Sequence, residues 1–250
     1  MGRQLKLPLR RRRGRPAKKE PRGHRVRPDL AARFPVHVTL KVVRGAPYLR
    51  RGVCFRAIRG ALVAGKEKGE FRLAQFTVQG NHLHLICEAG DKISLARGMQ
   101  GLAIRIARQL NRRANRKGKL FAERYHARIL RTPTEVRNAL VNVINNSRRH
   151  RAGVGRGWVD PLSSAAWFDG WRWPLREPWV RLERENDAPV VAAKTWLLTT
   201  GWHYRGLIRF DEIGRAHTGP PTAGGTGDER TPLSPSCPRS HVWVVAYRGR

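Results

Sequence analysis

The sequence predicts an α+β fold: a ferredoxin-like split β-α-β sandwich, in which helices cover one face of an antiparallel sheet, plus an extra C-terminal helix. Three observations support this fold class. Strand-like and helix-like segments follow the order β-α-β-β-α-β-α between residues 34 and 150. A Gly-Asn turn separates the two central strands, and the longest segment repeats apolar residues every three or four positions.

The first four elements occupy residues 34–89. FPVHVTLKVV, which begins at Phe34, is rich in the β-branched residues that favour strands. Residues 49–64 then show apolar side chains at roughly helical spacing. FRLAQFTVQGNHLHLICEA contains two strand-like runs broken at Gln79-Gly80-Asn81, a combination suited to a tight turn. These segments predict a strand, a helix and an antiparallel hairpin.

Two helices and one strand complete the predicted domain. Residues 91–115 form an amphipathic helix that either Asp91 or Ser94 can cap. LFAERYHARILR is predicted to be a strand. The last helix begins at Thr132-Pro133-Thr134-Glu135, where a capping threonine, a first-turn proline and a glutamate are all start signals, and it runs to about His150.

Composition divides the chain into four regions. Residues 1–28 hold 12 Lys or Arg and one Glu, so self-repulsion and scarce apolar side chains predict disorder. The expected regions are a disordered basic arm (1–32), the folded domain (33–152), a Trp-rich extension (153–218) and a mostly disordered tail (219–250). The tryptophans of the extension are expected to pack against the domain, with base stacking as the alternative.

Charge points to a polyanionic partner. The chain carries 51 Lys and Arg against 18 Asp and Glu, a net charge of +33, and 39 of these basic residues lie in residues 1–159 with only 8 acidic ones. Such a surface binds nucleic acid strongly at low salt and weakly at high salt. The predicted 91–115 helix has a basic outer face. Either this face is merely solvated or, as we expect, it contacts DNA phosphates through Arg105, Arg108, Arg112, Arg113, Arg116, Lys117 and Lys119.

The expected location is the cytoplasm, with association to the nucleoid when DNA is bound. No apolar run is long enough for a signal peptide or a membrane span, so no membrane contact is expected. Cys54, Cys87 and Cys237 form no C-x-x-C pair, which disfavours a zinc ribbon or a disulfide framework and suits a reducing compartment.

His82 and His84 are the strongest candidates for metal ligands. They lie two positions apart in a predicted strand, so both imidazoles leave the same face while Leu83 and Leu85 point to the core. Histidine is a common metal ligand, although an isolated H-x-H is more often two incidental histidines on a solvated strand. His37 and His126 can approach the same region, but lone strand histidines are usually packed or solvated.

The last predicted helix offers amide side chains. Asn142 and Asn146 are one turn apart and are expected to face the same way. An asparagine oxygen can complete a metal site; asparagines near a helix end also commonly cap it.

NHLHLI after a hairpin turn, the basic helix, the LFAERYHARILR strand and a helix ending in NVINNSRRH together resemble the single-tyrosine HUH transposases, especially REP-associated tyrosine transposases. The resemblance covers roughly residues 34–152 and favours the metal interpretation of His82 and His84. It implies a homodimer that binds single-stranded or hairpin DNA. It also implies Mg²⁺ or Mn²⁺ as cofactor and strand cleavage and rejoining by transesterification during DNA transposition.

In the family's mechanism, two histidines and a side chain of the last helix hold the metal, and a helix tyrosine attacks the phosphate. This resemblance assigns the metal ligands to His82, His84 and Asn146 and the nucleophile position to Asn142. An amide nitrogen is not nucleophilic, so this position departs from the family pattern. Tyr125 is a minor candidate as substitute nucleophile, since a packed or DNA-stacking role fits it better.

Two other functions compete with a transposase. A non-catalytic, domesticated DNA- or RNA-binding protein would keep the same surface, and Asn142 is the residue that favours it. Ribosome-associated RNA binding would explain the charge but gives no reason for an H-x-H beside a helix asparagine. The sequence predicts DNA binding with little covalent adduct, and more adduct after Asn142→Tyr.

Overall fold

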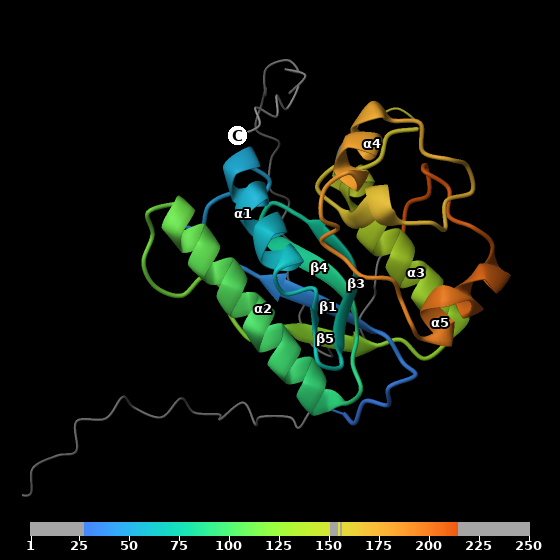
Figure 1. Ribbon diagram of the computed structural model, residues 1–250, viewed down its shortest axis with the longest axis horizontal. Helices are drawn as coiled ribbons and strands as arrows, with labels where there is room; N and C mark the ends of the chain where they lie inside the picture. The colour runs from blue at the N-terminus through green and yellow to red at the C-terminus, as the bar shows by residue number, and fades with distance from the viewer. Residues whose placement is uncertain (1–27, 151–154, 156, 215–250) are drawn as a thin grey trace, which may run out of the picture. The chain divides into compact units, whose positions relative to one another are not determined.

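The computed structural model describes residues 28–150, 155 and 157–214 (Figure 1). The predicted tail, and the predicted arm up to residue 27, lie outside the described residues. The centre is one antiparallel sheet with strand order β2-β3-β4-β1-β5. Its strands are β1 (Val36–Lys41), β2 (Glu67–Lys68), β3 (Phe71–Val78), β4 (His82–Glu88) and β5 (His126–Ile129).

Two interleaved crossovers build this sheet. Helix α1 (Gly52–Val63) connects β1 to β3 with β4 between them, and α2 (Lys92–Arg113) connects β4 to β5 with β1 between them. Because neighbouring strands are antiparallel, each crossover joins two parallel strands, which is the split β-α-β arrangement. Both helices pack on the same face of the sheet, over alternate strand residues such as Val38, Leu83 and Leu85. The predicted fold class is confirmed.

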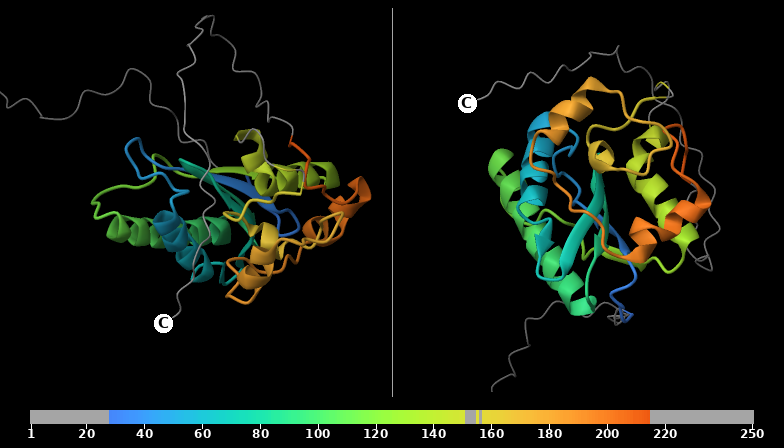
Figure 2. Two further views of the ribbon diagram at one scale, coloured as in Figure 1. Left: turned by 90° about the horizontal axis from the view of Figure 1, so that it is seen from above. Right: turned by 45° about the vertical axis from the view of Figure 1, so that its right-hand side comes forward.

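The added helix covers the other face. Helix α3 (Pro133–Ile144) lies across the sheet from α1 and α2 (Figure 2) and packs on Ala74 and Ile86. The extension packs on the same cluster through Phe168, Trp171 and Trp202. Its elements are η2 (Ser164–Trp167), α4 (Pro178–Arg184), α5 (Trp196–Thr199) and η3 (Gly201–Arg205).

The extension also covers an open edge of the sheet. Strand β2 is only two residues long, so most of β3 has no strand partner on that side. The backbone of Val191 donates to the carbonyl of Leu73 (2.9 Å), and that of Val78 donates to the carbonyl of Leu162 (3.0 Å). Unpaired strand edges invite aggregation. The extension therefore protects β3.

Local capping accounts for where the helices begin. Asp91, rather than Ser94, caps α2, since its carboxylate accepts from the Ser94 N–H at 2.6 Å. At α3 the Thr132 hydroxyl accepts from the Glu135 N–H (3.2 Å), and Glu135 accepts from the Arg131 N–H (2.8 Å). These contacts satisfy N–H groups that the helix itself leaves unpaired.

The predicted end of the last helix is wrong. Helix α3 ends at Ile144 instead of near His150, and the chain continues as a 3-10 helix, η1 (Asn146–His150). The Asn145 amide nitrogen donates to the carbonyls of Arg209 (2.9 Å) and Glu212 (3.1 Å), which fixes the C-terminal end of the helix to the extension. Asn146 is therefore not one α-helical turn beyond Asn142.

The strand predicted from LFAERYHARILR is also shorter than expected, since only His126–Ile129 pairs as β5. The preceding loop is held by its own side chains: Arg116 donates to the carbonyl of Lys119 (2.9 Å) and Lys119 to that of Ala122 (2.7 Å). Over the part of the chain that the structure describes, the helices are too short or too polar to span a membrane.

Candidate metal and nucleic-acid site

Polar side chains form a row across the face of the sheet that α3 covers. Thr77, His84, Thr39 and His126 are register partners on β3, β4, β1 and β5 in that order. The odd-numbered neighbours on β4, such as Leu83, point into the core under α1 and α2. Period-two alternation therefore leaves His82 and His84 on the same side of the sheet as α3.

The two histidines meet through their Nε2 atoms, which lie 3.0 Å apart. The other nitrogen of each ring is occupied: His82 Nδ1 is 2.8 Å from Asn81 Oδ1, and His84 Nδ1 is 3.2 Å from Thr39 Oγ1. His37 Nε2 also lies 3.2 Å from His84 Nδ1. These outer contacts hold the Nδ1 side of each ring and leave the two Nε2 atoms next to each other.

This geometry fits a divalent cation. Two adjacent ligands of an octahedral Mg²⁺, each about 2.1 Å from the ion, are about 3 Å apart. Polar partners on the second ring nitrogen are also typical of metal-bound histidines. Among the described residues no cluster of three or more His, Cys, Asp or Glu side chains is arranged to hold a metal. An ion at this pair would therefore take its other ligands from amide, water or phosphate oxygens.

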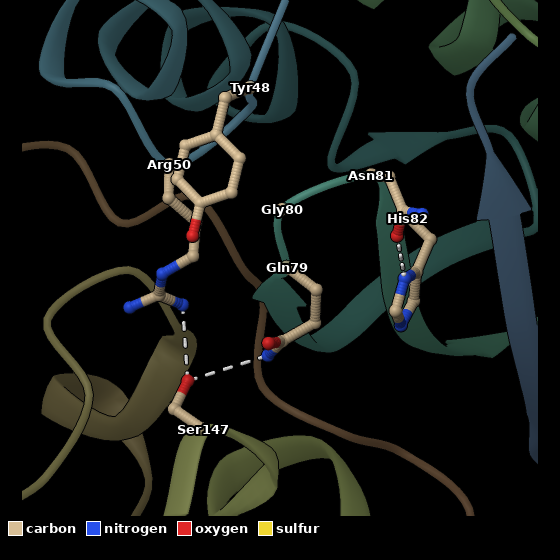
Figure 3. Close-up of a pocket in the computed structure, with 7 residues that line it drawn as sticks. All are labelled: Tyr48, Arg50, Gln79, Gly80, Asn81, His82 and Ser147. Carbon is tan, nitrogen blue, oxygen red and sulfur yellow. Dashed lines mark hydrogen bonds between the residues drawn. The ribbon is translucent and has the colours of Figure 1, made fainter. Parts of the chain in front are cut away.

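A pocket of about 220 Å³ adjoins His82 (Figure 3). Its lining comes from the loop before α1, the β3–β4 turn and the start of η1: Tyr48, Arg50, Gln79, Gly80, Asn81, His82 and Ser147. In Figure 3 the Tyr48 and His82 rings stand on either side of the Gly80–Asn81 turn. Sequence reasoning missed this pocket because its walls are remote along the chain.

Arg50, which lines the pocket, belongs to a buried ion pair. The two terminal nitrogens of the Arg50 guanidinium, Nη1 and Nη2, each lie 2.8 Å from a carboxylate oxygen of Asp160, which belongs to the extension. The Ser147 hydroxyl donates to the same carboxylate, and Arg50 also donates to Ser147 (3.1 Å). Burial lowers the pKa of Arg50, but the hydrogen bond and charge of Asp160 outweigh it and raise the pKa. Arg50 therefore stays charged, and its charge is paired with that of Asp160.

The predicted helix residues lie in different surroundings. Asn146 is buried at the start of η1, directly before the pocket residue Ser147. Asn142 is half-buried on α3, and its Oδ1 lies against Gly214 of the extension. The structure thus brings His82 and His84 together, puts Asn146 beside a pocket wall and sets Asn142 against the extension.

Tyr125 faces the opposite side of the sheet. It is half-buried and packs against the core under α1 and α2, together with Ala127 and Ile129. His82 and His84 lie on the α3 side, so the sheet separates the Tyr125 ring from them. This position agrees with a packing role.

The predicted phosphate contacts lie along α2 and the loop after it. Arg108, Arg112, Arg113, Lys117 and Lys119 are exposed, while Arg105 and Arg116 are half-buried. Arg116 and Lys119 hydrogen-bond their own loop. Helix α2 covers the sheet face opposite the histidines. A DNA strand that contacts both regions therefore has to pass around an edge of the sheet.

Known proteins match part of this chain. Residues 36–138 match the family model described as "Transposase IS200 like". A solved structure described as "Structure of the REP associates tyrosine transposase bound to a REP hairpin" aligns with 56% of this chain and 80% of its own, at 15% identity and a TM-score of 0.44. Comparison with curated proteins finds no match. The match ends before Asn142, and residues 36–138 are thus similar to IS200-like transposases.

Proposed function

We propose that this transposase-like protein binds single-stranded or hairpin DNA and that His82 and His84 hold Mg²⁺ or Mn²⁺ for strand cleavage and rejoining by transesterification. The observation that carries the proposal is the 3.0 Å separation of the two Nε2 atoms, with both Nδ1 atoms engaged by neighbours. When bound, such an ion supplies Lewis-acid polarisation of a phosphate oxygen.

The chain's own residues would orient this site. Asn81 and Thr39 fix the two imidazole rings, and Asn146, which directly precedes the pocket residue Ser147, is the amide ligand that the family resemblance assigns. The exposed basic residues of α2 would hold the sugar-phosphate backbone, with Arg108 and Arg112 one helical turn apart. From the family resemblance we infer a homodimer, which sedimentation or light scattering would test. We also infer a cytoplasmic location with association to the nucleoid.

A second function, DNA binding without cleavage, is favoured by a specific observation. Asn142 stands where the family resemblance expects the nucleophile, and Tyr125 packs on the far side of the sheet from the histidines. A metal held by the two histidines would then help the protein to retain or fold DNA without cutting it.

The test uses the full chain and a labelled DNA hairpin with a single-stranded flank. Mn²⁺ binding and Mn²⁺-dependent DNA affinity should both be lost in His82→Ala and in His84→Ala. His126→Ala is the matched control, because His126 is an exposed histidine in the same row of the sheet. Unchanged Mn²⁺ affinity in His82→Ala would rule out the metal site.

Denaturing electrophoresis separates cleavage from simple binding. Wild type should give little covalent protein–DNA adduct, and Asn142→Tyr should give more, because it restores a hydroxyl at the family's nucleophile position. Strong adduct from wild type that Tyr125→Phe abolishes would reverse the assignment of these two residues.

A further inference from the structure

We propose that the pocket beside His82 binds one unstacked nucleobase of the DNA strand, stacked on Tyr48. The inference rests on the proposed function, since it concerns the nucleotide next to the phosphate held at His82. The pocket volume, about 220 Å³, is below the range of roughly 300–1,000 Å³ usual for drug-sized ligands. A single ring system suits this size.

Tyr48 has the properties of a stacking platform. Its side chain is large, and 55% of it is exposed. The ring rests on the β3–β4 turn so closely that a Cβ added at Gly80 would come within 2.5 Å of its Cε2 atom. The Leu49 N–H donates to the Gly80 carbonyl at 2.9 Å, which holds this loop on the turn. Aromatic rings held in this way bind unstacked bases of any sequence.

The charge of the pocket favours a base over a phosphate. Its guanidinium, Arg50, is neutralised by Asp160, and the two side chains are only 6% and 1% exposed. Arg50 also donates to the carbonyl of Val78 at 2.7 Å. A phosphate entering the pocket would therefore find no uncompensated guanidinium.

The other polar groups of the lining suit the edge of a base. Gln79 and Asn81 carry uncharged amide groups, the kind of group that hydrogen-bonds base edges. The Ser147 hydroxyl is already engaged by Asp160 and Arg50. Asn81 joins the pocket to the candidate metal site, because its Oδ1 contacts His82 Nδ1. A base held here belongs to a nucleotide whose backbone lies next to His82. Binding it would select which phosphate reaches the histidine pair.

The experiment measures affinity for the hairpin with a single-stranded flank and for a series of the same DNA with one base removed at each flank position. Tyr48→Ala should bind the intact DNA about tenfold more weakly, and Tyr48→Phe should bind like wild type, because phenylalanine keeps the ring. At one flank position, base removal should weaken wild type about tenfold and leave Tyr48→Ala unchanged. Tyr204→Ala is the matched control, since Tyr204 is an exposed tyrosine on η3.

Several results would overturn the base pocket. The first is that Tyr48→Ala binds the intact DNA as tightly as wild type does, and the second is that Tyr48→Phe loses as much affinity as Tyr48→Ala. The third is that Tyr48→Ala binds every DNA of the abasic series more weakly than wild type does. The last pattern also covers a variant that merely distorts the turn. If wild type fails to bind the DNA or to respond to Mn²⁺, the proposed function itself fails. If it binds and responds while the abasic series is flat, only the base pocket fails.

Discussion

The carboxylate of Asp160 accepts two 2.8 Å hydrogen bonds from the guanidinium of Arg50, which lies 110 residues earlier in the chain. The pair connects the Trp-rich extension to the loop before α1, and Ser147 joins both at the start of η1. The extension is therefore part of the structure that shapes the candidate site.

Replacing Asp160 with Ala should destabilise the protein strongly. Removing one partner of a buried ion pair leaves an uncompensated charge and costs about 3–5 kcal/mol. Urea unfolding followed by circular dichroism measures the free energy of unfolding. Glu185→Gln, which breaks the exposed Arg181–Glu185 pair at the end of α4, should change it by less than about 0.5 kcal/mol. Similar effects of the two variants would mean that the Arg50–Asp160 pair is not buried in solution.

The sequence predicted those features that depend on residues close together in the chain. The N-caps at Asp91 and Thr132 each act on an N–H three residues later, and strand alternation suffices to put His82 and His84 on one face. The end of α3 could not be predicted in this way, because Asn145 is held by carbonyls 64 and 67 residues further on. The contact of Thr39 and His37 with His84 likewise depends on strand register, and the Arg50–Asp160 pair depends on the tertiary fold.

Trp202→Ala should also destabilise the protein, because Trp202 is 1% exposed and packs in the cluster between α3 and the sheet. Large-to-small changes of buried aromatics cost about 3–5 kcal/mol. Trp196→Ala is the matched control on the neighbouring helix α5, since Trp196 is 55% exposed. Equal midpoints of thermal unfolding for Trp202→Ala and wild type would contradict a joint core of domain and extension.

DNA affinity should depend on salt through the exposed face of α2. For single-stranded DNA, each phosphate that a protein neutralises adds about 0.7 to the steepness of log K against log salt. Combining Arg108→Gln with Arg112→Gln should therefore reduce the slope by roughly 1.4. Arg181→Gln, an exposed arginine on α4, should leave it unchanged. If the double variant keeps the wild-type slope, this face of α2 is only solvated.

The Glu135 contacts should make stability depend on pH. Burial raises the pKa of Glu135, but the Arg131 N–H and the Arg128 guanidinium outweigh burial, so the net pKa is lowered. A lowered pKa means that this stabilisation is present above the ordinary glutamate pKa and is lost as the pH falls through the folded-state value. Glu135→Gln should therefore reduce the free energy of unfolding more at pH 7 than at pH 3. An equal loss at both pH values would show that the ionised carboxylate is not what stabilises the start of α3.

Gly80→Ala provides a test of the base pocket that leaves Tyr48 itself intact. The new methyl group would meet the Tyr48 ring, so the ring has to move away from the turn. Affinity for the hairpin with a single-stranded flank should fall toward that of Tyr48→Ala, and the two changes together should weaken binding no further. Gly60→Ala is the control, since it meets only the end of Gln109 at 3.8 Å and favours helix α1. Additive losses from Gly80→Ala and Tyr48→Ala would mean that the turn contacts DNA independently of the tyrosine.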